Sequence, residues 1–492
     1  EISLCDRLDR RSGHCCFLRV GLPCLVYAVG DAERGYAMIA YRFFRSVFRI
    51  AIRAFFSSIE VEGIANVPDS GPVILVPNHT NALVDGLVVG CCLKRPVTLT
   101  AKTTLAGNPV VRWMMRAAGV ITMQRRQDAK QQSDMRANEL AFGQIRDVLE
   151  SGGAVCLFPE GKSYSEPSVQ KFHTGAARIA LSFLTESRLP ESLLIVPVGL
   201  HFEKKSVFRS RAWVGFGAPV NALQWSLEHP DEDAAELTRL LEQRVRALVM
   251  DFDARERSEL FRGAAELLAT HGEAPPELGL SAPAELSEQL RLVHVLQEGN
   301  EQLRRTLPDR LNALEDRIRQ HLAELDYHAV APREVFLKMH SGRAAFFVLR
   351  ELELVLLGGP IALWGLLNHL PLLLAVRALA GRITHEEDQY ATNVIFISVI
   401  VFPLFYILFI ALAAHFLSPG WLLLYLISVL YAGAYSIRWF DRVRGAFRRS
   451  RSYLLWRRRP ELQQSLVEDG RDIISEIRRL GDLLEANHGN PA

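Results

Sequence analysis

The sequence carries almost no net charge, because its 57 lysines and arginines are balanced by 55 aspartates and glutamates. A net charge of +2 gives no sign of a nucleic-acid partner, since such proteins carry a clear basic excess. Cysteine is also scarce: there are seven, and no C-x-x-C pair occurs. This usage excludes a disulfide framework and predicts reduced thiols in a cytosolic compartment.

Three catalytic motifs are missing as well. The Gly-Lys-Ser at 161–163 resembles the end of a phosphate-binding P-loop, but that loop needs a glycine where Cys156 stands. Neither G-x-S-x-G nor H-E-x-x-H occurs. The sequence therefore gives no support for a P-loop nucleotidase, a serine hydrolase with a nucleophile elbow or a zinc protease of the H-E-x-x-H class.

Apolar residues are abundant, at 49% of the chain, and they concentrate between residues 350 and 440. Residues 393–416 carry no formal charge over about 24 positions, the length that spans a bilayer. Residues 421–437 form a second, shorter span after a Ser-Pro-Gly turn. Residues 354–376 are broken by Gly-Gly-Pro and by Asn-His-Leu-Pro, so they form either one span or a re-entrant hairpin.

An arginine excess follows the last span. It predicts that residues 441–492 form a basic helical tail in the cytoplasm, where it can contact anionic lipid headgroups. If residues 57–222 are cytoplasmic too, the segment 354–376 must enter and leave the membrane on one face, which favours the hairpin. The arginines are Arg438, Arg442, Arg444, Arg448, Arg449, Arg451, Arg457, Arg458 and Arg459.

The N-terminal residues 1–35 are a leader of uncertain status. A basic start and an apolar stretch resemble a signal peptide, but Arg19 and Pro23 interrupt that stretch, which argues against secretion. Residues 36–56 place apolar residues at helical spacing with arginines on another face. They predict an amphipathic helix that lies either on a membrane surface or half-buried in the protein.

The middle of the chain changes pattern once. Over residues 57–222, short β-rich runs alternate with helical runs, which predicts an α/β domain with a mixed sheet flanked by helices. Residues 229–342 are helical and charged, with a helical hairpin broken at Pro308. A proline- and glycine-containing stretch at 271–285 is a predicted linker.

A histidine and an aspartate follow the apolar run Gly-Pro-Val-Ile-Leu. Imidazole can take a proton from a hydroxyl and return it, and a carboxylate on its other nitrogen fixes the tautomer and stabilises the cation. His79 and Asp85 are six residues apart, so the loop between them must curl for the two side chains to meet. Taken alone, the pair also fits a structural histidine.

Three more strand ends carry distinctive residues. "GVITMQRR" ends with Arg125 and Arg126, "CLFPEGKS" occupies residues 156–163, and "IVPVGLHF" contains Pro197. With the His-Asp pair, these segments resemble the four motifs of the glycerolipid acyltransferase family, which includes glycerol-3-phosphate and lysophosphatidate acyltransferases. The Phe-Pro-Glu-Gly segment is the most specific, and the resemblance covers about residues 57–222.

Two features depart from most of that family. Five residues separate the histidine from the aspartate instead of four, which resembles the branch that acylates glycerol 3-phosphate and dihydroxyacetone phosphate. His173 stands in "FHTG", where related bacterial sequences often have a lysine that would help to hold phosphate.

The resemblance implies a membrane-bound enzyme that moves a fatty acyl group from acyl-CoA or acyl-carrier protein to glycerol 3-phosphate or dihydroxyacetone phosphate. It belongs to phosphatidic acid and phospholipid biosynthesis and needs no cofactor and no metal. His79 is the expected general base and Asp85 its orienting partner. Arg125 and Lys102 are the expected phosphate-binding cations, because a guanidinium grips phosphate bidentately and an ammonium adds charge.

Glu160, Gly161 and Ser163 are implied in the acceptor site, where a glycine lets backbone N–H groups approach. Pro197 completes the substrate-binding set. Each has a structural alternative, such as a turn residue for Glu160 or a strand-edge residue for Pro197.

Two other functions stay open from the sequence. The first is the second acylation step, by a 1-acyl-sn-glycerol-3-phosphate acyltransferase. The second is a non-catalytic membrane scaffold that binds lipid and recruits partners through residues 229–342 and the tail.

Overall fold

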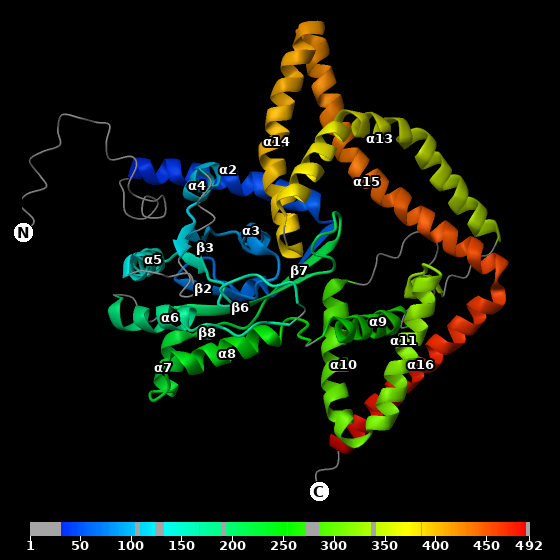
Figure 1. The fold of residues 1–492 in the computed structure, drawn as a ribbon, viewed down its shortest axis with the longest axis horizontal. Helices are drawn as coiled ribbons and strands as arrows, with labels where there is room; N and C mark the ends of the chain where they lie inside the picture. The colour runs from blue at the N-terminus through cyan, green and yellow to red at the C-terminus, as the bar shows by residue number, and fades with distance from the viewer. Residues whose placement is uncertain are drawn as a thin grey trace, which may run out of the picture. The chain divides into compact units, whose positions relative to one another are not determined.

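Figure 1 shows the fold of the chain as a computed structural model. The structure describes residues 31–103, 109–123, 132–166, 168–187, 193–252, 254–271, 285–335, 341–384 and 386–488. Most of the predicted leader lies outside these ranges. The chain divides into two compact units, of which the first holds residues 1–165, 169–206 and 213–248 and the second holds 166–168, 207–212 and 249–492.

The first unit is built on an 8-stranded sheet in the order β1-β7-β6-β2-β5-β3-β4, with β8 paired to β6. Neighbouring strands from β6 to β4 run parallel, whereas β8 is antiparallel to β6, so the predicted mixed sheet is confirmed. The strands are β1 (Ser58–Glu62), β2 (Val73–Pro77), β3 (Val97–Lys102), β4 (Ile121–Met123), β5 (Ala154–Cys156), β6 (Leu194–Phe202), β7 (Arg211–Phe216) and β8 (Val220–Asn221).

Helices cover both faces of this sheet (Figure 1). All five residues of β2 are buried, as expected for a parallel strand with helices on both sides. α3 packs on β3, and α6 and α8 pack together against β2. The helices are α2 (Asp31–Phe55), α3 (Ala82–Cys92), α4 (Pro109–Ala117), α5 (Gln132–Glu150), α6 (Gly175–Glu186), α7 (Ala222–Glu228) and α8 (Ala234–Arg246), with a 3-10 turn η1 (Ile64–Asn66).

The predicted amphipathic helix of residues 36–56 corresponds to α2, which ends at Phe55 and packs against α3 and α4. Phe48 and Ile52 are buried in that contact. Ile39 and Phe43 are exposed, at 66% and 63%. The helix is therefore half-buried and still presents apolar side chains to its surroundings.

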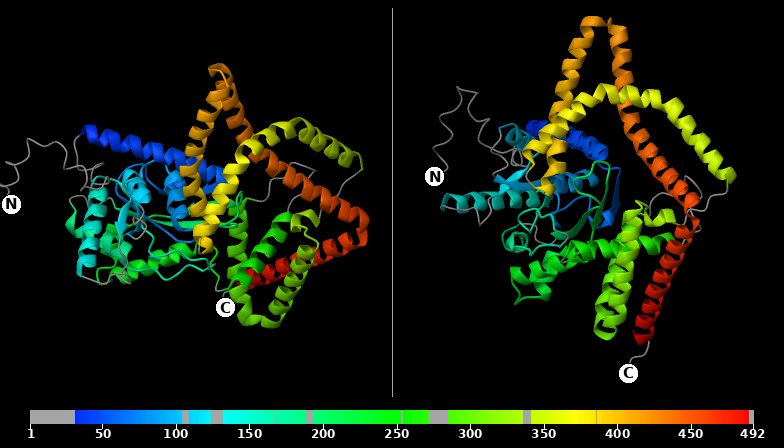
Figure 2. Two further views of the ribbon diagram at one scale, coloured as in Figure 1. Left: turned by 45° about the horizontal axis from the view of Figure 1, so that its top comes forward. Right: turned by 45° about the vertical axis from the view of Figure 1, so that its right-hand side comes forward.

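The second unit contains a helical bundle. Residues of α9, α10 and α11 share one hydrophobic core with Ile473, Ile474 and Leu480 of α16, and Figure 2 shows α16 running beside α10 and α11. The predicted tail thus belongs to a bundle whose other helices precede the apolar segments in the sequence. The bundle helices are α9 (Arg255–His271), α10 (Leu286–Thr306), α11 (Pro308–Tyr327), α12 (Pro332–Val335) and α16 (Pro460–His488).

Three helices of this unit are long and apolar enough to cross a membrane, at Leu349–Ile383, Glu387–Phe416 and Pro419–Arg458. They belong to α13 (Ser341–Ile383), α14 (Glu387–Phe416) and α15 (Pro419–Arg458). The sequence favours a break within residues 354–376, but Pro360 and Pro371 lie inside one continuous helix. Proline removes a backbone hydrogen bond and bends a helix. Figures 1 and 2 show α13 as an arch.

The first half of the arch runs antiparallel to α15. The indole nitrogen of Trp439 donates to the Leu354 carbonyl at 3.2 Å. Further along, the Tyr425 hydroxyl donates to Asn368 Oδ1 at 2.7 Å. Along these contacts the residue numbers rise in α13 and fall in α15. This half of α13 therefore runs toward the turn that joins α14 to α15.

The second half of α13 pairs with α14 in the opposite sense. His369 Nε2 and the Tyr406 hydroxyl are hydrogen-bonded, and Asn393 Nδ2 donates to Thr384 Oγ1 at 2.9 Å. Residues 369–384 of α13 therefore run alongside α14 from its middle toward its first residues. Both ends of α13 lie at the end of the α14–α15 pair that is away from its connecting turn.

Candidate active site

The carboxyl edge of the parallel strands collects the predicted residues of the first unit. Leu75 of β2 pairs with Cys156 of β5, and Cys156 also pairs with Leu99 of β3. His79 lies four residues after Leu75, and Glu160 lies four residues after Cys156. The topology therefore places these two side chains at one edge of the sheet.

His79 and Asp85 are in direct contact. His79 Nδ1 lies 2.9 Å from Asp85 Oδ2, and the same oxygen accepts hydrogen bonds from the backbone N–H groups of Thr80 and Asn81, both at 2.7 Å. Ala82 starts α3 with a φ of 45°, which curls the loop so that Asp85, in the first helical turn, lies beneath the ring. Since a carboxylate oxygen only accepts, Nδ1 carries the proton and Nε2 keeps its lone pair.

The Phe-Pro-Glu-Gly segment holds the histidine from the other side. The Phe158 ring stacks on the His79 imidazole with centroids 4.2 Å apart. The His79 backbone N–H donates to Glu160 Oε1 at 2.9 Å, and its carbonyl accepts from the Tyr164 N–H at 3.1 Å. Backbone and ring are thus fixed by residues that lie about 80 positions away in the sequence.

Glu160 is 4% exposed, and this burial raises the pKa of its carboxyl group to about 8. Hydrogen bonds from the backbones of His79 and Gln170 act in the opposite direction but do not outweigh burial. Gly161 follows with a φ of +74°, a conformation that suits glycine, and its N–H donates to the Phe158 carbonyl at 3.1 Å. Burial therefore favours the protonated form of Glu160, which can donate a hydrogen bond.

Sequence reasoning missed two residues of this arrangement, Phe158 and Asn78. Asn78 Nδ2 donates to the Leu200 carbonyl at 3.1 Å, and the Leu200 N–H donates to Asn78 Oδ1 at 2.7 Å. This amide continues the pairing of β2 with β6 by one more position and fixes where the loop to His79 begins. Phe158 stands in the most specific motif, so its position was a usable signal, whereas only the sheet order reveals Asn78.

The other predicted residues that the structure describes are Lys102, Ser163 and Pro197. Lys102 is half-buried at the last position of β3. Ser163 is half-buried in the segment that follows Gly161. Pro197 is buried inside β6 opposite Val76, and its carbonyl accepts from the Gly217 N–H at 2.8 Å, so it packs the sheet.

The cation set is described only in part. Arg125 and Arg126 lie outside the residues that the structure describes. The exposed His173 lies beside Gly161, where an added Cβ would be 3.3 Å from the imidazole. Lys205 donates to the carbonyls of Tyr164 and Ser165, at 3.1 and 3.3 Å, so it fixes the loop after the Phe-Pro-Glu-Gly turn.

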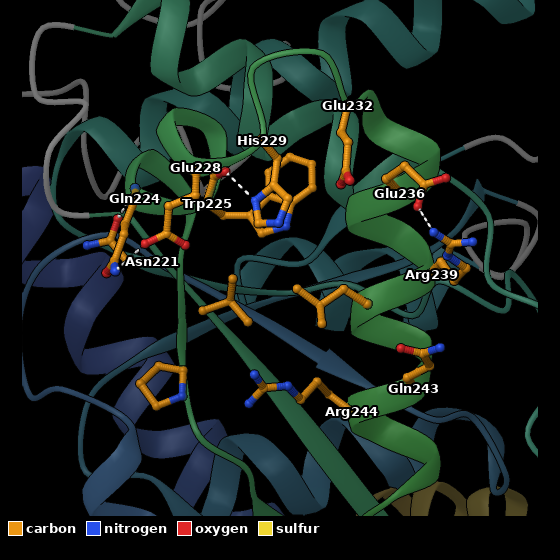
Figure 3. A pocket seen from close by; sticks show the side chains of 13 residues that line it. Asn221, Gln224, Trp225, Glu228, His229, Glu232, Glu236, Arg239, Gln243 and Arg244 are labelled. Carbon is orange, nitrogen blue, oxygen red and sulfur yellow. Dashed lines mark hydrogen bonds and ion pairs between the residues drawn. The ribbon is translucent and has the colours of Figure 1, made fainter.

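A cavity of about 440 Å³ lies at the opposite edge of the sheet, between β8, α7 and α8 (Figure 3). β8 pairs with the first residues of β6, which are in register with the start of β2, whereas His79 follows the end of β2. The Trp225 and His229 rings stack in this cavity with centroids 5.1 Å apart. It is therefore separate from the His79–Asp85 pair.

Part of the chain is similar to known proteins. Residues 58–201 match the family model described as Acyltransferase. Glycerol-3-phosphate O-acyltransferase 2 of Saccharomyces cerevisiae is 35% identical over 83 residues, which are 17% of this chain and 11% of that protein. A 1-acyl-sn-glycerol-3-phosphate acyltransferase of Chlamydomonas reinhardtii is 28% identical over 146 residues, which are 30% of this chain and 41% of that protein.

Among solved structures, the 1-acyl-sn-glycerophosphate acyltransferase of Thermotoga maritima is 18% identical with a TM-score of 0.34, and the match covers 45% of this chain and 82% of that one. The chain thus matches less than half the length of the two curated relatives named above.

Proposed function

We propose that this chain, whose residues 58–201 form an acyltransferase-family domain, transfers a fatty acyl group from a thioester to a glycerol phosphate at a membrane. The observation that carries the proposal is the His79–Asp85 contact of 2.9 Å at the carboxyl edge of the sheet. The preferred acceptor is glycerol 3-phosphate or dihydroxyacetone phosphate, and the donor is acyl-CoA or acyl-carrier protein.

The geometry supports a direct transfer without an acyl-enzyme. His79 Nε2 takes the proton from the acceptor hydroxyl as its oxygen attacks the thioester carbon. Asp85 stabilises the imidazolium that forms. The tetrahedral intermediate then collapses, the carbon–sulfur bond breaks, and the imidazolium returns its proton to the leaving thiolate. The products are the acylated glycerol phosphate and a free thiol.

Glu160 and the cations shape the acceptor site in this proposal. A protonated Glu160 can donate a hydrogen bond to an oxygen of the acceptor, while Gly161, whose N–H is bonded to the Phe158 carbonyl, holds the turn that follows it. Lys102 and Arg125 would hold the phosphate. Among the matched relatives, one is a glycerol-3-phosphate acyltransferase and another acts on the 1-acyl form, so the second acylation step is the alternative reaction.

The bundle supports one orientation in the membrane. α9, α10 and α11 precede the apolar helices and α16 follows them, yet they share one core, which supports placing them on the same side of the membrane. α13 starts and ends on that side, while α14 and α15 cross and return. The arginines after α15 favour the cytoplasm for that side. No candidate span separates the first unit from the bundle among the described residues, so we place both units there.

Activity is tested with membranes that contain the protein, labelled palmitoyl-CoA and three separate acceptors: glycerol 3-phosphate, dihydroxyacetone phosphate and lysophosphatidate. His79→Ala should abolish the product, and His328→Ala, at the end of α11, should leave it unchanged. Product from the lysolipid alone would move the protein to the second step. Absence of any His79-dependent product with either thioester donor would favour the non-catalytic scaffold.

Orientation is tested with single cysteines in a variant whose native cysteines are removed. Asp69→Cys and Ser475→Cys are exposed sites before and after the apolar helices, and Ser418→Cys lies in the turn between α14 and α15. In sealed inside-out vesicles a membrane-impermeant maleimide should label the first two and spare the third. Opposite labelling of Asp69→Cys and Ser475→Cys would contradict the arrangement.

A further inference from the structure

A group of arginines gathers where α13 and α15 leave their apolar stretches. Glu351 Oε1 accepts from Arg350 at 3.0 Å and from Arg442 at 3.5 Å. One helical turn toward the apolar side, Trp439 bonds the backbone of Leu354. Tryptophan side chains prefer the boundary between lipid tails and headgroups. Glu351 and the arginines around it are therefore at headgroup depth.

A second buried carboxylate, from α12, contacts α15 further along that helix. Glu334 of α12 is 3% exposed. Its Oε1 pairs with Arg448 Nε at 2.6 Å, and its Oε2 accepts from the Ser452 hydroxyl at 2.8 Å. The Trp456 indole donates to its backbone carbonyl at 2.9 Å. α12 is thus fixed on the face of α15 that continues from the membrane boundary.

Positive charge exceeds negative charge in this region. We call it the arginine cluster and define it as Arg333, Arg350, Arg442, Arg448 and Arg449. Five guanidinium groups surround the two carboxylates of Glu334 and Glu351, which leaves a net charge of +3.

Other described charges beside the cluster are of both signs. Glu266 and Arg211 act on Arg333 with opposite signs, and Asp441 is paired with Arg209 at 2.7 Å. Arg449 lies near Glu351 and Glu334 as well as near Arg448 and Arg350. Arg442 and Arg448 are exposed, so a ligand can reach them, and converging cations are stabilised by an added anion.

We propose that the arginine cluster binds the phosphate of an anionic lipid headgroup at the membrane face where α15 ends. Guanidinium groups bind phosphate oxygens bidentately, and the cluster's depth matches the headgroup layer of the bilayer. Arg442 and Arg449 are seven residues apart, about two turns, so they lie on the same side of α15, and both are near Glu351. A phosphomonoester lipid carries more charge than a phosphodiester lipid and is the preferred occupant.

This site does not depend on the proposed reaction. It lies in the second unit and uses none of the residues of the His79 site. Its occupant would hold the junction of α12, α13 and α15 against the bilayer surface. Loss of acyl transfer on His79→Ala therefore leaves the lipid prediction intact, and loss of lipid binding leaves the reaction intact.

The test measures lipid binding by the full chain in an uncharged detergent, by native mass spectrometry with phosphatidate, phosphatidylglycerol, phosphatidylcholine and inorganic phosphate. Arg442→Gln with Arg449→Gln should weaken phosphatidate binding about tenfold or more for each arginine, the loss expected for hydrogen bonds to a charged group. The matched control is Arg444→Gln with Arg451→Gln, which removes the same charge from positions of α15 outside the arginine cluster and should change binding less than about threefold.

Several results would overturn the proposal. Equal losses in the two double variants would mean that only diffuse charge attracts the lipid. Equal binding of phosphatidylcholine would exclude charge recognition, and binding of inorganic phosphate with the same arginine dependence would make the occupant a free anion. If the glutamine variant does not fold, Arg442→Lys with Arg449→Lys keeps the charge and should still lose bidentate binding.

Discussion

Replacing Asp85 by asparagine should remove one charge from the candidate active site with little change in its shape. Asp85 Oδ2 accepts two backbone N–H groups and the His79 ring, which only an oxygen can do. The asparagine carbonyl should therefore take that position and the amide nitrogen the position of Oδ1, so that the imidazole keeps its tautomer. What is lost is the attraction between the carboxylate and the imidazolium that forms during transfer.

The size of this loss follows from the contact. With Nδ1 and Oδ2 at 2.9 Å, the two charge centres are about 4 Å apart. At an effective dielectric constant of about 20, that separation corresponds to about 4 kcal/mol. Since about 1.4 kcal/mol is a tenfold change in rate, Asp85→Asn should slow transfer about a thousandfold. Asp85→Ala should be worse, because it also releases the loop that positions His79.

The assay is single-turnover transfer from palmitoyl-CoA to glycerol 3-phosphate, together with thermal unfolding of each variant. Asp69→Asn is the control, because Asp69 is an exposed aspartate of the same unit. If Asp85→Asn transfers the acyl group within tenfold of the parent rate, the Asp85 carboxylate does not stabilise the His79 imidazolium in the way argued above. A large loss of thermal stability in Asp85→Asn would show that the shape was not kept.

Three further predictions concern stability. Burial raises the pKa of Glu160 from 4.5 to about 8, so the folded chain keeps a proton that the unfolded chain releases between these pH values. Stability should therefore fall as the pH rises from 4.5 to about 8. Thermal unfolding of Glu160→Gln should lack that decline, and parallel pH profiles of the variant and the parent would contradict the prediction. Ile473→Ala should destabilise the bundle by about 2–5 kcal/mol in denaturant unfolding, whereas Leu483→Ala, 41% exposed, should have a small effect. Gly365→Ala would place a Cβ 2.2 Å from the Ala432 carbonyl and should lower the unfolding temperature, whereas Gly381→Ala in the same helix meets nothing within 4 Å.

Local patterns predicted the parts of the site that neighbouring residues determine. The apolar run before His79 predicted β2, and the Phe-Pro-Glu-Gly segment predicted a second strand end. Their meeting at one edge follows from the parallel order of β2 and β5. The Asn78 contact depends instead on which strand lies beside β2, and β6 is more than a hundred residues away.

The membrane part shows the same limit. Composition predicted three apolar segments correctly, because length and lack of charge are local properties. The prolines at 360 and 371 suggested a break, but α13 continues through both. Tertiary contacts of Asn368 and His369 with α15 and α14 accompany the arch, and sequence spacing does not reveal those partners.

The bundle core also sets an order of events during synthesis. Leu260 and Ile318 are made before the apolar helices, whereas Ile473 is made after them, yet all three belong to one core. The ribosome must therefore finish α13, α14 and α15 before the bundle can close. Until then the nascent bundle lacks the α16 part of its core, and incompletely packed apolar surface of this kind favours aggregation and proteolysis.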